Sequence, residues 1–362
     1  MKIAIFTDNF RLDMGGGTKV VYDLALGLKK QGHEVLVVTG KAVDSRLKDE
    51  FRIFSLPSLR YPFYDRAELV LPSLNLIREV EQFAPDVIHY HEPFTAGMIA
   101  VMMGRYFKKP VVGTVHIDPM HISYHSVKFD NGKIAKLLVG FMARQSDAMV
   151  FVSNYQLETY RPFLPSDVPL RVIHPGIPDY FFSSQKASFC RRVITVTRLA
   201  PEKNLEFGLR VVSEVQKFVD FEYLVVGEGP ERKKLEKLAE KLKVRVTFLG
   251  AVRRERLPEL YSSSSVFFLP SKYETFGLVF AEAMACGLPV VCLNSGSAPE
   301  VVGEAGFVCE ENIDLLVKSL KLLLTDEKVW EEKSVLARKR SERFRLENAV
   351  KEHLKLYEEL LS

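Results

Sequence analysis

The sequence has little of what defines several classes of protein. It holds four cysteines in 362 residues, and none forms a Cys-x-x-Cys pair, which excludes a disulfide-stabilised scaffold and favours free thiols in a reducing compartment. No apolar run approaches the roughly 18 residues that a membrane-spanning helix needs. The N-terminal segment becomes polar at Asp8, too early for a secretory signal. We therefore expect a cytoplasmic protein, with contact at a membrane surface left open.

An excess of charge of one sign is also missing. Lys and Arg number 50 against 46 Asp and Glu, a net charge of +4. Residues 1–180 hold 21 basic and 19 acidic residues and residues 181–362 hold 29 and 27, so each half carries +2. This balance excludes a strongly basic nucleic-acid-binding domain, and we expect no nucleic-acid partner. The most basic stretch, residues 231–256, interleaves Lys and Arg with Glu, which is typical of a solvated helix face.

What the sequence does contain is an alternation of short apolar runs with amphipathic segments, which occurs twice along the chain. Such runs predict buried strands, and the periodic segments between them predict helices. This order predicts the α/β class, with two Rossmann-like, doubly wound parallel-sheet domains that face each other across a cleft. The expected strands cover residues 3–6, 35–38, 87–89, 111–115 and 149–152 in the first half, and 193–196, 223–226, 246–249, 266–269 and 289–293 in the second.

A polar segment at residues 183–188 follows a proline-rich stretch and marks the expected domain boundary. We predict a first domain over residues 1–182, a second over residues 190–345, and a charged C-terminal helix over residues 346–362. Open parallel sheets bind ligands beyond the carboxyl ends of their strands. Residues that directly follow a strand are therefore the candidates for a functional site.

A glycine loop, Gly15-Gly16-Gly17, stands between the first expected strand and the first expected helix. Glycines let a backbone approach a phosphate closely, and a helix N-terminus offers N–H groups and a partial positive charge. The spacing matches neither the dinucleotide-binding fingerprint nor the P-loop. A phosphate-binding loop and a simple tight turn both remain open.

Arg198 and Lys203 form a second candidate group, in the segment between a strand end and a helix. Arginine can donate to a phosphate in a fork and lysine adds a point charge, so two cations in one loop suit a diphosphate. The alternative is a surface loop whose charges are unrelated.

Glu274 and Glu282 form the third group. Glu274 falls at a strand-to-helix turn, and Glu282 lies inside a helix that is apolar on nearly every side. A carboxylate in such surroundings is costly without a partner. The hydroxyls of a sugar or ribose would supply one, and a backbone amide or a lysine is the alternative.

These segments together resemble the family-4 retaining glycosyltransferases of the GT-B fold. The strongest match is the E-x7-E signature, which Glu274 and Glu282 fill within the run YETFGLVFAEAMACGLPVV. The glycine loop also matches, as do the segments PDVIHYHEP (85–93), TRLAPEKN (197–204) and VVGEGPE (225–231). The resemblance thus covers nearly the whole chain.

The resemblance implies transfer of a hexose from a UDP- or GDP-linked sugar to a hydroxyl acceptor, with configuration retained and with neither cofactor nor metal. It implies that Arg198 and Lys203 hold the donor diphosphate, that Glu282 accepts from the donor ribose, and that Glu274 faces the transferred sugar. His116 would lie beside the anomeric centre, and the C-terminal helix would pack back on the first domain. The resemblance also implies donor binding by three further groups of residues. These are Gly15, Gly16 and Gly17 in the glycine loop, Ala251 and Val252 near the nucleobase, and Phe276, Gly277 and Leu278 at a helix N-terminus.

One segment departs from the family's pattern. Many relatives carry an Asn-Gly-Val-Asp run after the first domain, where this chain has Pro175-Gly176-Ile177-Pro178. Proline therefore replaces both the Asn and the Asp. Whatever that loop contributes must come from other atoms, and the neighbouring Asp179 cannot be assumed to substitute.

Two other functions compete with this interpretation. A metal-dependent hydrolase is the first, because His89, His91, His116, His121 and His125 crowd one part of the chain and the last two have the i, i+4 spacing of a helical metal pair. The absence of an H-E-x-x-H motif and a nearby proline weigh against it. The second is a sugar-nucleotide-binding protein without activity, against which the intact candidate charges count.

The acceptor is suggested by a segment that mixes aromatic and basic side chains, namely Arg60, Tyr61, Phe63, Tyr64 and Arg66. The regions around residues 55–72 and 116–125 are similar to those of relatives that glycosylate diacylglycerol or phosphatidylinositol. This implies a lipid acceptor and peripheral contact at the inner face of the cytoplasmic membrane. A soluble sugar or a growing glycan as acceptor stays open, as does a folded loop whose aromatics pack in a core.

Overall fold

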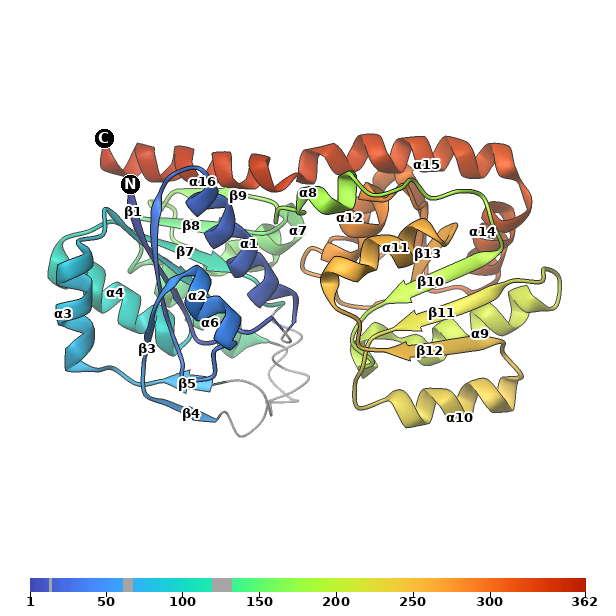
Figure 1. Ribbon diagram of the computed structural model, residues 1–362, viewed down its shortest axis with the longest axis horizontal. Helices are drawn as coiled ribbons and strands as arrows, with labels where there is room; N and C mark the ends of the chain where they lie inside the picture. Colours follow the sequence, from blue (N-terminus) through green and yellow to red (C-terminus); the bar gives the residue numbers. More distant parts are fainter. Residues whose placement is uncertain (13–14, 61–67, 119–131) are drawn as a thin grey trace. The chain divides into compact units, whose positions relative to one another are not determined.

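The computed structural model describes residues 1–12, 15–60, 68–118 and 132–362. The chain forms two compact units, unit 1 with residues 1–176 and 346–362 and unit 2 with residues 177–345. Each unit is built on its own parallel sheet with helices on its faces (Figure 1), which confirms the predicted fold class. The first segment of unit 1 ends at Gly176, whereas the boundary was expected between residues 182 and 190. The residues in between belong to unit 2, since Phe181 is buried and packs against Tyr261 of that unit.

The sheet of unit 1 has the strand order β3-β2-β1-β6-β7-β8-β9. β1 pairs in parallel with β2 on one side and β6 on the other. The chain therefore leaves β1 in one direction and returns on its other side, so the switch point of the sheet lies between β1 and β6, where open α/β sheets bind ligands. The strands are β1 (Lys2–Thr7), β2 (Glu34–Thr39), β3 (Arg52–Ser55), β6 (Val87–His91), β7 (Val111–Val115), β8 (Ala148–Phe151) and β9 (Leu170–Val172), with a separate antiparallel pair, β4 (Ser58–Arg60) and β5 (Glu68–Val70).

Helices cover both faces of this sheet. Val80 of α3, Ile99 of α4 and Val139 of α6 are buried in one core, whereas Leu24 of α1 and Val350 of α16 are buried in the core on the other face. Each helix thus buries one apolar stripe, as amphipathic surface helices do. Their bounds are α1 (Gly16–Lys30), α2 (Ser45–Glu50), α3 (Leu74–Phe83), α4 (Thr95–Phe107), α6 (Lys133–Ala143), α7 (Asn154–Tyr160) and α16 (Leu346–Leu361).

The last helix, α16, belongs to unit 1 although the chain reaches it only after unit 2. It packs closely on α1, since a Cβ atom at Gly27 would lie 2.4 Å from Cγ2 of Val350. Leu356 and Tyr357 are buried in the same core. The Tyr357 hydroxyl also lies 2.6 Å from Nδ1 of His89 in β6, so α16 is tied to the centre of the sheet by a buried hydrogen bond.

Unit 2 repeats the architecture with the strand order β12-β11-β10-β13-β14-β15, so its switch point lies between β10 and β13. The strands are β10 (Arg192–Val196), β11 (Glu222–Val226), β12 (Val246–Gly250), β13 (Val266–Leu269), β14 (Val290–Leu293) and β15 (Gly306–Cys309). The helices are α8 (Asp179–Phe182), α9 (Leu205–Gln216), α10 (Arg232–Leu242), α11 (Leu257–Ser262), α12 (Leu278–Ala285), α13 (Ala298–Val302), α14 (Ile313–Thr325) and α15 (Glu327–Ser341).

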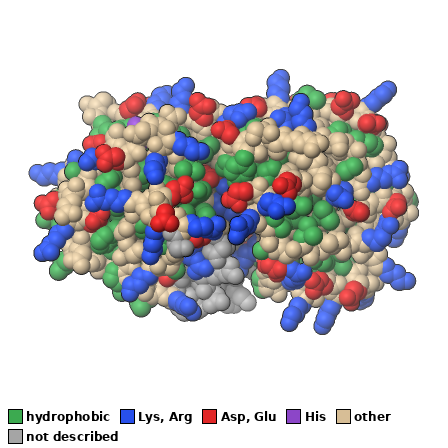
Figure 2. Space-filling model, in the orientation of Figure 1, with side chains coloured by type: hydrophobic (Ala, Val, Ile, Leu, Met, Phe, Trp, Pro, Cys, Tyr) green, Lys and Arg blue, Asp and Glu red, His purple; other side chains and the backbone are tan. Residues whose placement is uncertain are grey.

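Charges of both signs mix on the face of the molecule that Figure 2 shows, where Lys and Arg side chains are interspersed with Asp and Glu. On α10, Arg232 pairs with Glu236 at 2.8 Å and Lys234 with Glu231 at 3.3 Å, which confirms the prediction of a solvated, charge-laced helix. Within the described residues, no helix is both long enough and apolar enough for a membrane span.

We predict that Leu356→Ala destabilises unit 1 alone. Removing a buried leucine costs about 2–5 kcal/mol, whereas Leu361→Ala, at a side chain 45% exposed, should cost less than about 0.5 kcal/mol. The single tryptophan, Trp330, is buried in unit 2, so its fluorescence reports unit 2 while far-UV circular dichroism reports both units. Leu356→Ala should lower the denaturation midpoint seen by circular dichroism without moving the fluorescence transition. Equal shifts of both transitions would contradict the assignment of α16 to unit 1.

Candidate functional site

The switch point of the unit 2 sheet brings together two of the predicted groups. Arg198 follows β10 with an exposed side chain, and Lys203 ends the short 3₁₀ turn Pro201–Lys203. Lys203 Nζ lies 2.7 Å from Oε1 of Glu274, which follows β13, and the two side chains are only 18% and 11% exposed. The ion pair thus joins the loops that follow two neighbouring strands. Because water reaches it poorly, this pair is screened less than a surface ion pair.

Backbone contacts hold the loop that carries Arg198. Gly227 adopts φ +134°, and a Cβ atom there would fall 1.8 Å from the carbonyl oxygen of Thr197. Leu199 N in turn donates to the carbonyl of Glu228 at 3.0 Å. The loop after β11 therefore lies flat on the loop after β10, which only a glycine at this φ permits. The backbone on both sides of Arg198 is fixed, as a preorganised binding loop requires.

Glu274 stands just ahead of the N-terminus of α12. Its carbonyl accepts a hydrogen bond from Ser297 N at 2.9 Å. Gly277 precedes the helix with φ +80°, Phe276 is buried against Phe344, and Leu278 is the first helical residue. The first amides of a helix lack intrahelical acceptors and carry a partial positive charge, so this end of α12 suits an anion.

Glu282 has a partner that the sequence analysis missed. Its side chain is 2% exposed, and Arg254 Nε donates to its Oε1 at 2.7 Å. The Arg254 guanidinium, 9% exposed, also lies 5.6 Å from the ring centre of Phe181. The alternative of a backbone amide or a lysine as the protein partner is corrected here: the partner is an arginine, whose fork matches a carboxylate and tolerates burial. The predicted bond to a sugar or ribose hydroxyl stays a prediction. Arg254 follows β12 in the same loop as the exposed Ala251 and the half-buried Val252.

The switch point of the unit 1 sheet carries two carboxyl groups that the sequence analysis did not select. Asp8 follows β1 and is 5% exposed; its Oδ1 accepts from Ala96 N at 3.1 Å and from the Thr95 hydroxyl. Glu92 follows β6 in a left-handed conformation, φ +78°, which is rare outside glycine and clusters at functional sites. Oδ2 of Asp8 and Oε2 of Glu92 have no hydrogen-bond partner among the described residues.

Burial removes water from both carboxyl groups and raises their pKa values. Burial raises the pKa of Asp8 to about 6, against the opposing hydrogen bond from Thr95. It also raises the pKa of Glu92 well above its usual range, and the neighbouring Asp8 charge adds to that shift. Two carboxyl groups with raised pKa values beside unused oxygen atoms are suited to bind hydroxyl groups.

Four histidines line the same part of unit 1. His91 and His116 stack with ring centres 5.2 Å apart, and His89 lies 4.3 Å from His91 and 5.5 Å from His353 of α16. Burial lowers the pKa of His353 to about 4 and those of His89, His91 and His116 below their usual range. The cluster is therefore neutral at pH 7, and it lies next to the first turn of α1, where a Cβ at Gly17 would be 3.5 Å from His116.

The hydrogen bonds of His91 favour one tautomer of His116. His91 Nδ1 lies 2.8 Å from His116 Nε2, and His91 Nε2 has no partner in the described part of the chain. A buried N–H without an acceptor costs more than an unused lone pair. His91 then carries its proton on Nδ1 and donates to His116, which leaves His116 with a proton on its own Nδ1.

The remaining predicted residues lie at the start of α1, at the end of β4 or outside the described residues. Gly15 precedes α1, whereas Gly16 and Gly17 lie in its first turn rather than in a loop. Arg60 is exposed at the end of β4. Tyr61, Phe63, Tyr64 and Arg66 lie outside the described residues, and so do His121 and His125. Among the residues that are described, no three His, Cys, Asp or Glu side chains are placed to hold a metal ion.

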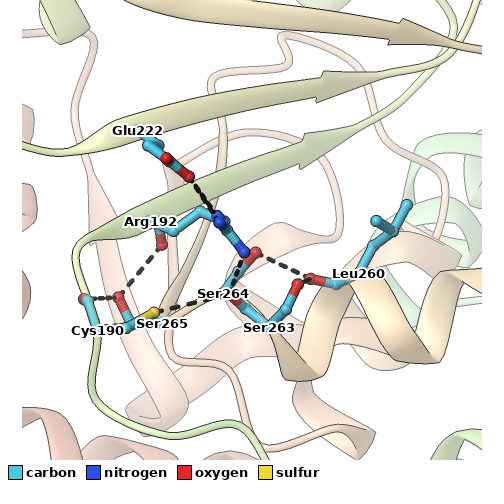
Figure 3. A network of polar contacts seen from close by, with 7 residues as sticks. All are labelled: Cys190, Arg192, Glu222, Leu260, Ser263, Ser264 and Ser265. Atoms are coloured by element: carbon cyan, nitrogen blue, oxygen red, sulfur yellow. Dashed lines mark hydrogen bonds and ion pairs between the residues drawn. The ribbon is translucent and has the colours of Figure 1, made fainter.

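A hollow at the opposite edge of the unit 2 sheet holds several arginines, and polar groups in it form hydrogen bonds with one another. There Arg192 Nε donates to Glu222 at 2.7 Å and its Nη1 donates to the Ser263 carbonyl at 3.0 Å (Figure 3). The Ser265 hydroxyl closes the network on the Cys190 carbonyl at 2.6 Å. These groups join the amino ends of β10, β11 and β13, so we assign them to structure.

Known proteins resemble this chain over almost its full length. The model of "Glycosyltransferase Family 4" matches residues 14–180, and the model of "Glycosyl transferases group 1" matches residues 177–343. The sulfoquinovosyl transferase SQD2 of Arabidopsis thaliana is 27% identical over 88% of this chain, which spans 65% of that protein's length. The alpha-monoglucosyldiacylglycerol synthase of Streptococcus pneumoniae is 25% identical over 80% of this chain and 70% of its own. A GDP-mannose-dependent alpha-mannosyltransferase of Corynebacterium glutamicum is 26% identical over 84% of this chain and 75% of its own.

Solved structures resemble the fold. Anabaena Alr3699/HepE in complex with UDP and glucose matches with a TM-score of 0.78 at 21% identity, covering 99% of this chain and 100% of that one. Sucrose-phosphate synthase from Thermosynechococcus elongatus matches with a TM-score of 0.79 at 20% identity, covering 99% and 98%. These likenesses show the GT-B fold.

We predict that the Arg254–Glu282 pair is strongly coupled. Arg254→Met leaves a buried carboxylate alone and Glu282→Leu leaves a buried guanidinium alone, so each should lower the stability of unit 2 by about 3–5 kcal/mol. The double variant should recover most of that loss, because neither charge is then stranded. Trp330 fluorescence during denaturation measures unit 2. Additive losses in the double variant would contradict a direct pair.

We predict that Asp8 lowers the stability of unit 1 at neutral pH. Its folded pKa of about 6 exceeds the unfolded value near 3.9, so the folded state holds the extra proton and stability falls as pH rises from about 4 to 6. A shift of about two units corresponds to about 3 kcal/mol. Asp8→Asn cannot ionise, and should therefore gain stability relative to the parent across that window and keep the gain above pH 6.

The buried histidines act in the opposite direction, because their folded pKa values are lowered and they stabilise unit 1 above about pH 6.5. Comparing Asp8→Asn with the parent at each pH cancels that contribution. Chemical denaturation followed by circular dichroism at pH 4, 5, 6 and 7.5 makes the measurement. A difference that does not change with pH would show that Asp8 titrates normally.

Proposed function

We propose a reaction for this chain, which belongs to the family-4 glycosyltransferases of the GT-B fold: it moves a hexose from a UDP- or GDP-linked sugar to a hydroxyl acceptor, with retention of configuration. Use of a nucleotide sugar follows from the family. The observation that carries the assignment to this site is the Lys203–Glu274 ion pair beside Arg198, at the switch point of the unit 2 sheet. The UDP complex of a structural neighbour and the GDP-mannose dependence of a relative support the two donor classes.

Unit 2 is proposed to bind the donor. Arg198 and Lys203 hold the diphosphate together with the first amides of α12, where Phe276, Gly277 and Leu278 lie. Ala251 and Val252 border the nucleobase. Glu282 accepts from the ribose, and Gly15, Gly16 and Gly17 at the start of α1 are further proposed donor-binding residues.

The chemistry proposed is charge stabilisation. The bond between the sugar and the diphosphate breaks through an oxocarbenium-like transition state, and negative charge builds on the departing phosphate. Arg198, Lys203 and the α12 amides would stabilise that charge, and preorganised electrostatic stabilisation of this kind is usually the largest single contribution to catalysis. These protein cations replace the divalent metal that other phosphate enzymes use, so the reaction needs no metal or cofactor.

Retention is proposed to follow from attack on the face that the diphosphate leaves. The departing phosphate takes the acceptor's proton as the new bond forms. Glu274 is already bonded to Lys203, which supports a role in holding the sugar rather than one as a nucleophile. His116, with its proton on Nδ1, donates a hydrogen bond beside the anomeric centre.

The acceptor is proposed to be a membrane glycerolipid or phosphoinositide, reached from the cytoplasmic side. The names of two relatives, a sulfoquinovosyl transferase and a monoglucosyldiacylglycerol synthase, support this class. The unused oxygens of Asp8 and Glu92 would bind the acceptor hydroxyl in unit 1. A soluble sugar or glycan is the alternative acceptor.

We predict that the purified protein slowly hydrolyses one UDP- or GDP-hexose without acceptor, and that Arg198→Ala lowers this kcat by about 100-fold or more, since a donor to developing charge is lost. Arg191→Ala, at an exposed arginine of the opposite sheet edge, is the matched control and should keep full activity. Near-normal turnover of Arg198→Ala would remove that residue from the site.

We also predict that EDTA leaves most of the hydrolytic activity in place, because protein cations hold the diphosphate. A loss of activity on chelation that Mn²⁺ or Zn²⁺ restores would contradict metal independence. Lipid acceptors are added in a second round.

A further inference from the structure

Two neighbouring helices of unit 1 expose an unusual number of large apolar side chains. On α4, Met98, Met102 and Tyr106 are 41%, 57% and 65% exposed. On α6, Ile134, Leu137 and Phe141 are 59%, 54% and 53% exposed. The spacing is i, i+4, i+8 on the first helix and i, i+3, i+7 on the second, so each set forms one stripe along its helix. We call these six residues the α4–α6 face.

The two stripes belong to one surface. Both helices bury their opposite sides in the same core, with Ile99 of α4 and Val139 of α6 among its members. A Cβ atom at Gly97 of α4 would lie 3.3 Å from Cε of Met142 in α6. Since the two helices touch and lie on the same side of the sheet, their outward stripes are adjacent.

The charges on the two helices themselves have one sign. Residues 95–109 and 132–145, which contain the two helices, hold no Asp or Glu. This differs from α10, where Arg232 pairs with Glu236 of the same helix and Lys234 with Glu231 just before it. Contiguous exposed apolar side chains mark interaction surfaces on soluble domains, and the excess of cations on the two helices favours an anionic partner. The cations in the two segments are Arg105, Lys108, Lys109, Lys133, Lys136 and Arg144.

We propose that the α4–α6 face docks on the surface of an anionic lipid bilayer. Apolar side chains flanked by lysine and arginine bind at the boundary of headgroups and acyl chains, and the cations are drawn to acidic lipids. A second copy of this chain fits the face less well, because a symmetric contact would oppose two sets of like charges. The proposal deepens the proposed function and rests on it for its purpose, which is access to a lipid acceptor.

The face reaches the edge of the sheet that carries the unit 1 candidate groups. The Thr95 hydroxyl at the start of α4 donates to Asp8, and Met98 lies one turn further along the same helix. Ile134 likewise lies in the first turn of α6. A docked face therefore holds the carboxyl edge of the sheet, with Asp8, Glu92 and His116, at the bilayer surface, where a lipid headgroup is presented without leaving the membrane.

Vesicle flotation with the full chain tests the proposal. We expect binding to vesicles of phosphatidylcholine with 30% phosphatidylglycerol at low salt, at least tenfold weaker binding in 0.5 M NaCl, and little binding to pure phosphatidylcholine. Leu137→Ser/Phe141→Ser should weaken binding at least tenfold. The matched control is Phe218→Ser/Leu315→Ser, which removes side chains 66% and 45% exposed from unit 2 and should bind like the parent. Lys133→Glu/Lys136→Glu tests the charge separately and should also bind weakly.

Absence of binding at low salt, or equal loss in the control, would overturn the proposal. A dimer seen by analytical ultracentrifugation and abolished by Leu137→Ser/Phe141→Ser would overturn it in favour of a second copy of the chain. Circular dichroism verifies that each variant folds. Hydrolysis of the sugar nucleotide in solution separates the two hypotheses. Vesicle binding without hydrolysis supports docking and refutes the proposed function. Hydrolysis without vesicle binding refutes docking and supports the proposed use of a sugar nucleotide.

Discussion

A charged group that leaves water must be paired or neutralised, and this constraint shapes both switch points. Unit 2 meets it by pairing, with Lys203 on Glu274 and Arg254 on Glu282. Unit 1 meets it by neutralisation, since burial raises the carboxyl pKa values of Asp8 and Glu92 and lowers those of the neighbouring histidines. One edge thus concentrates formal charge, which suits a diphosphate, and the other offers neutral hydrogen-bonding groups, which suit hydroxyls. The proposed division of the two substrates follows from that difference.

Much of the architecture could be predicted from the sequence, because buried parallel strands are nearly continuous runs of Val, Ile and Leu. Glu282 could be singled out for the same reason, as a carboxylate among Ala, Met and Phe needs a partner. Its partner could not be identified: Arg254 stands in a run of charged residues that is typical of a solvated surface, and only the packing of α12 against the loop after β12 brings it to the carboxylate.

Asp8, Glu92 and the α4–α6 face escaped prediction for a different physical reason. The positive φ of Glu92 and the unused oxygens of both carboxyl groups are properties of the folded backbone, with no counterpart in residue type or spacing. An apolar stripe on a helix normally predicts a buried side, and α6 carries two of them: Met142 is buried, whereas Phe141, the residue before it, is half exposed. Which stripe faces the core is decided by the neighbouring strands.

The assignment of α16 to unit 1 has a consequence for how the protein is made. A ribosome completes residues 177–345 before it reaches the helix that covers one face of the first sheet. Domains usually fold as units during synthesis, the N-terminal one first. Here the sheet of unit 1 must wait, with the apolar side chains of α1 and the His89 imidazole lacking their cover until residues 346–362 emerge. Unit 2 is thus free to fold before unit 1, and unit 1 stays exposed to chaperones and proteases while unit 2 is synthesised.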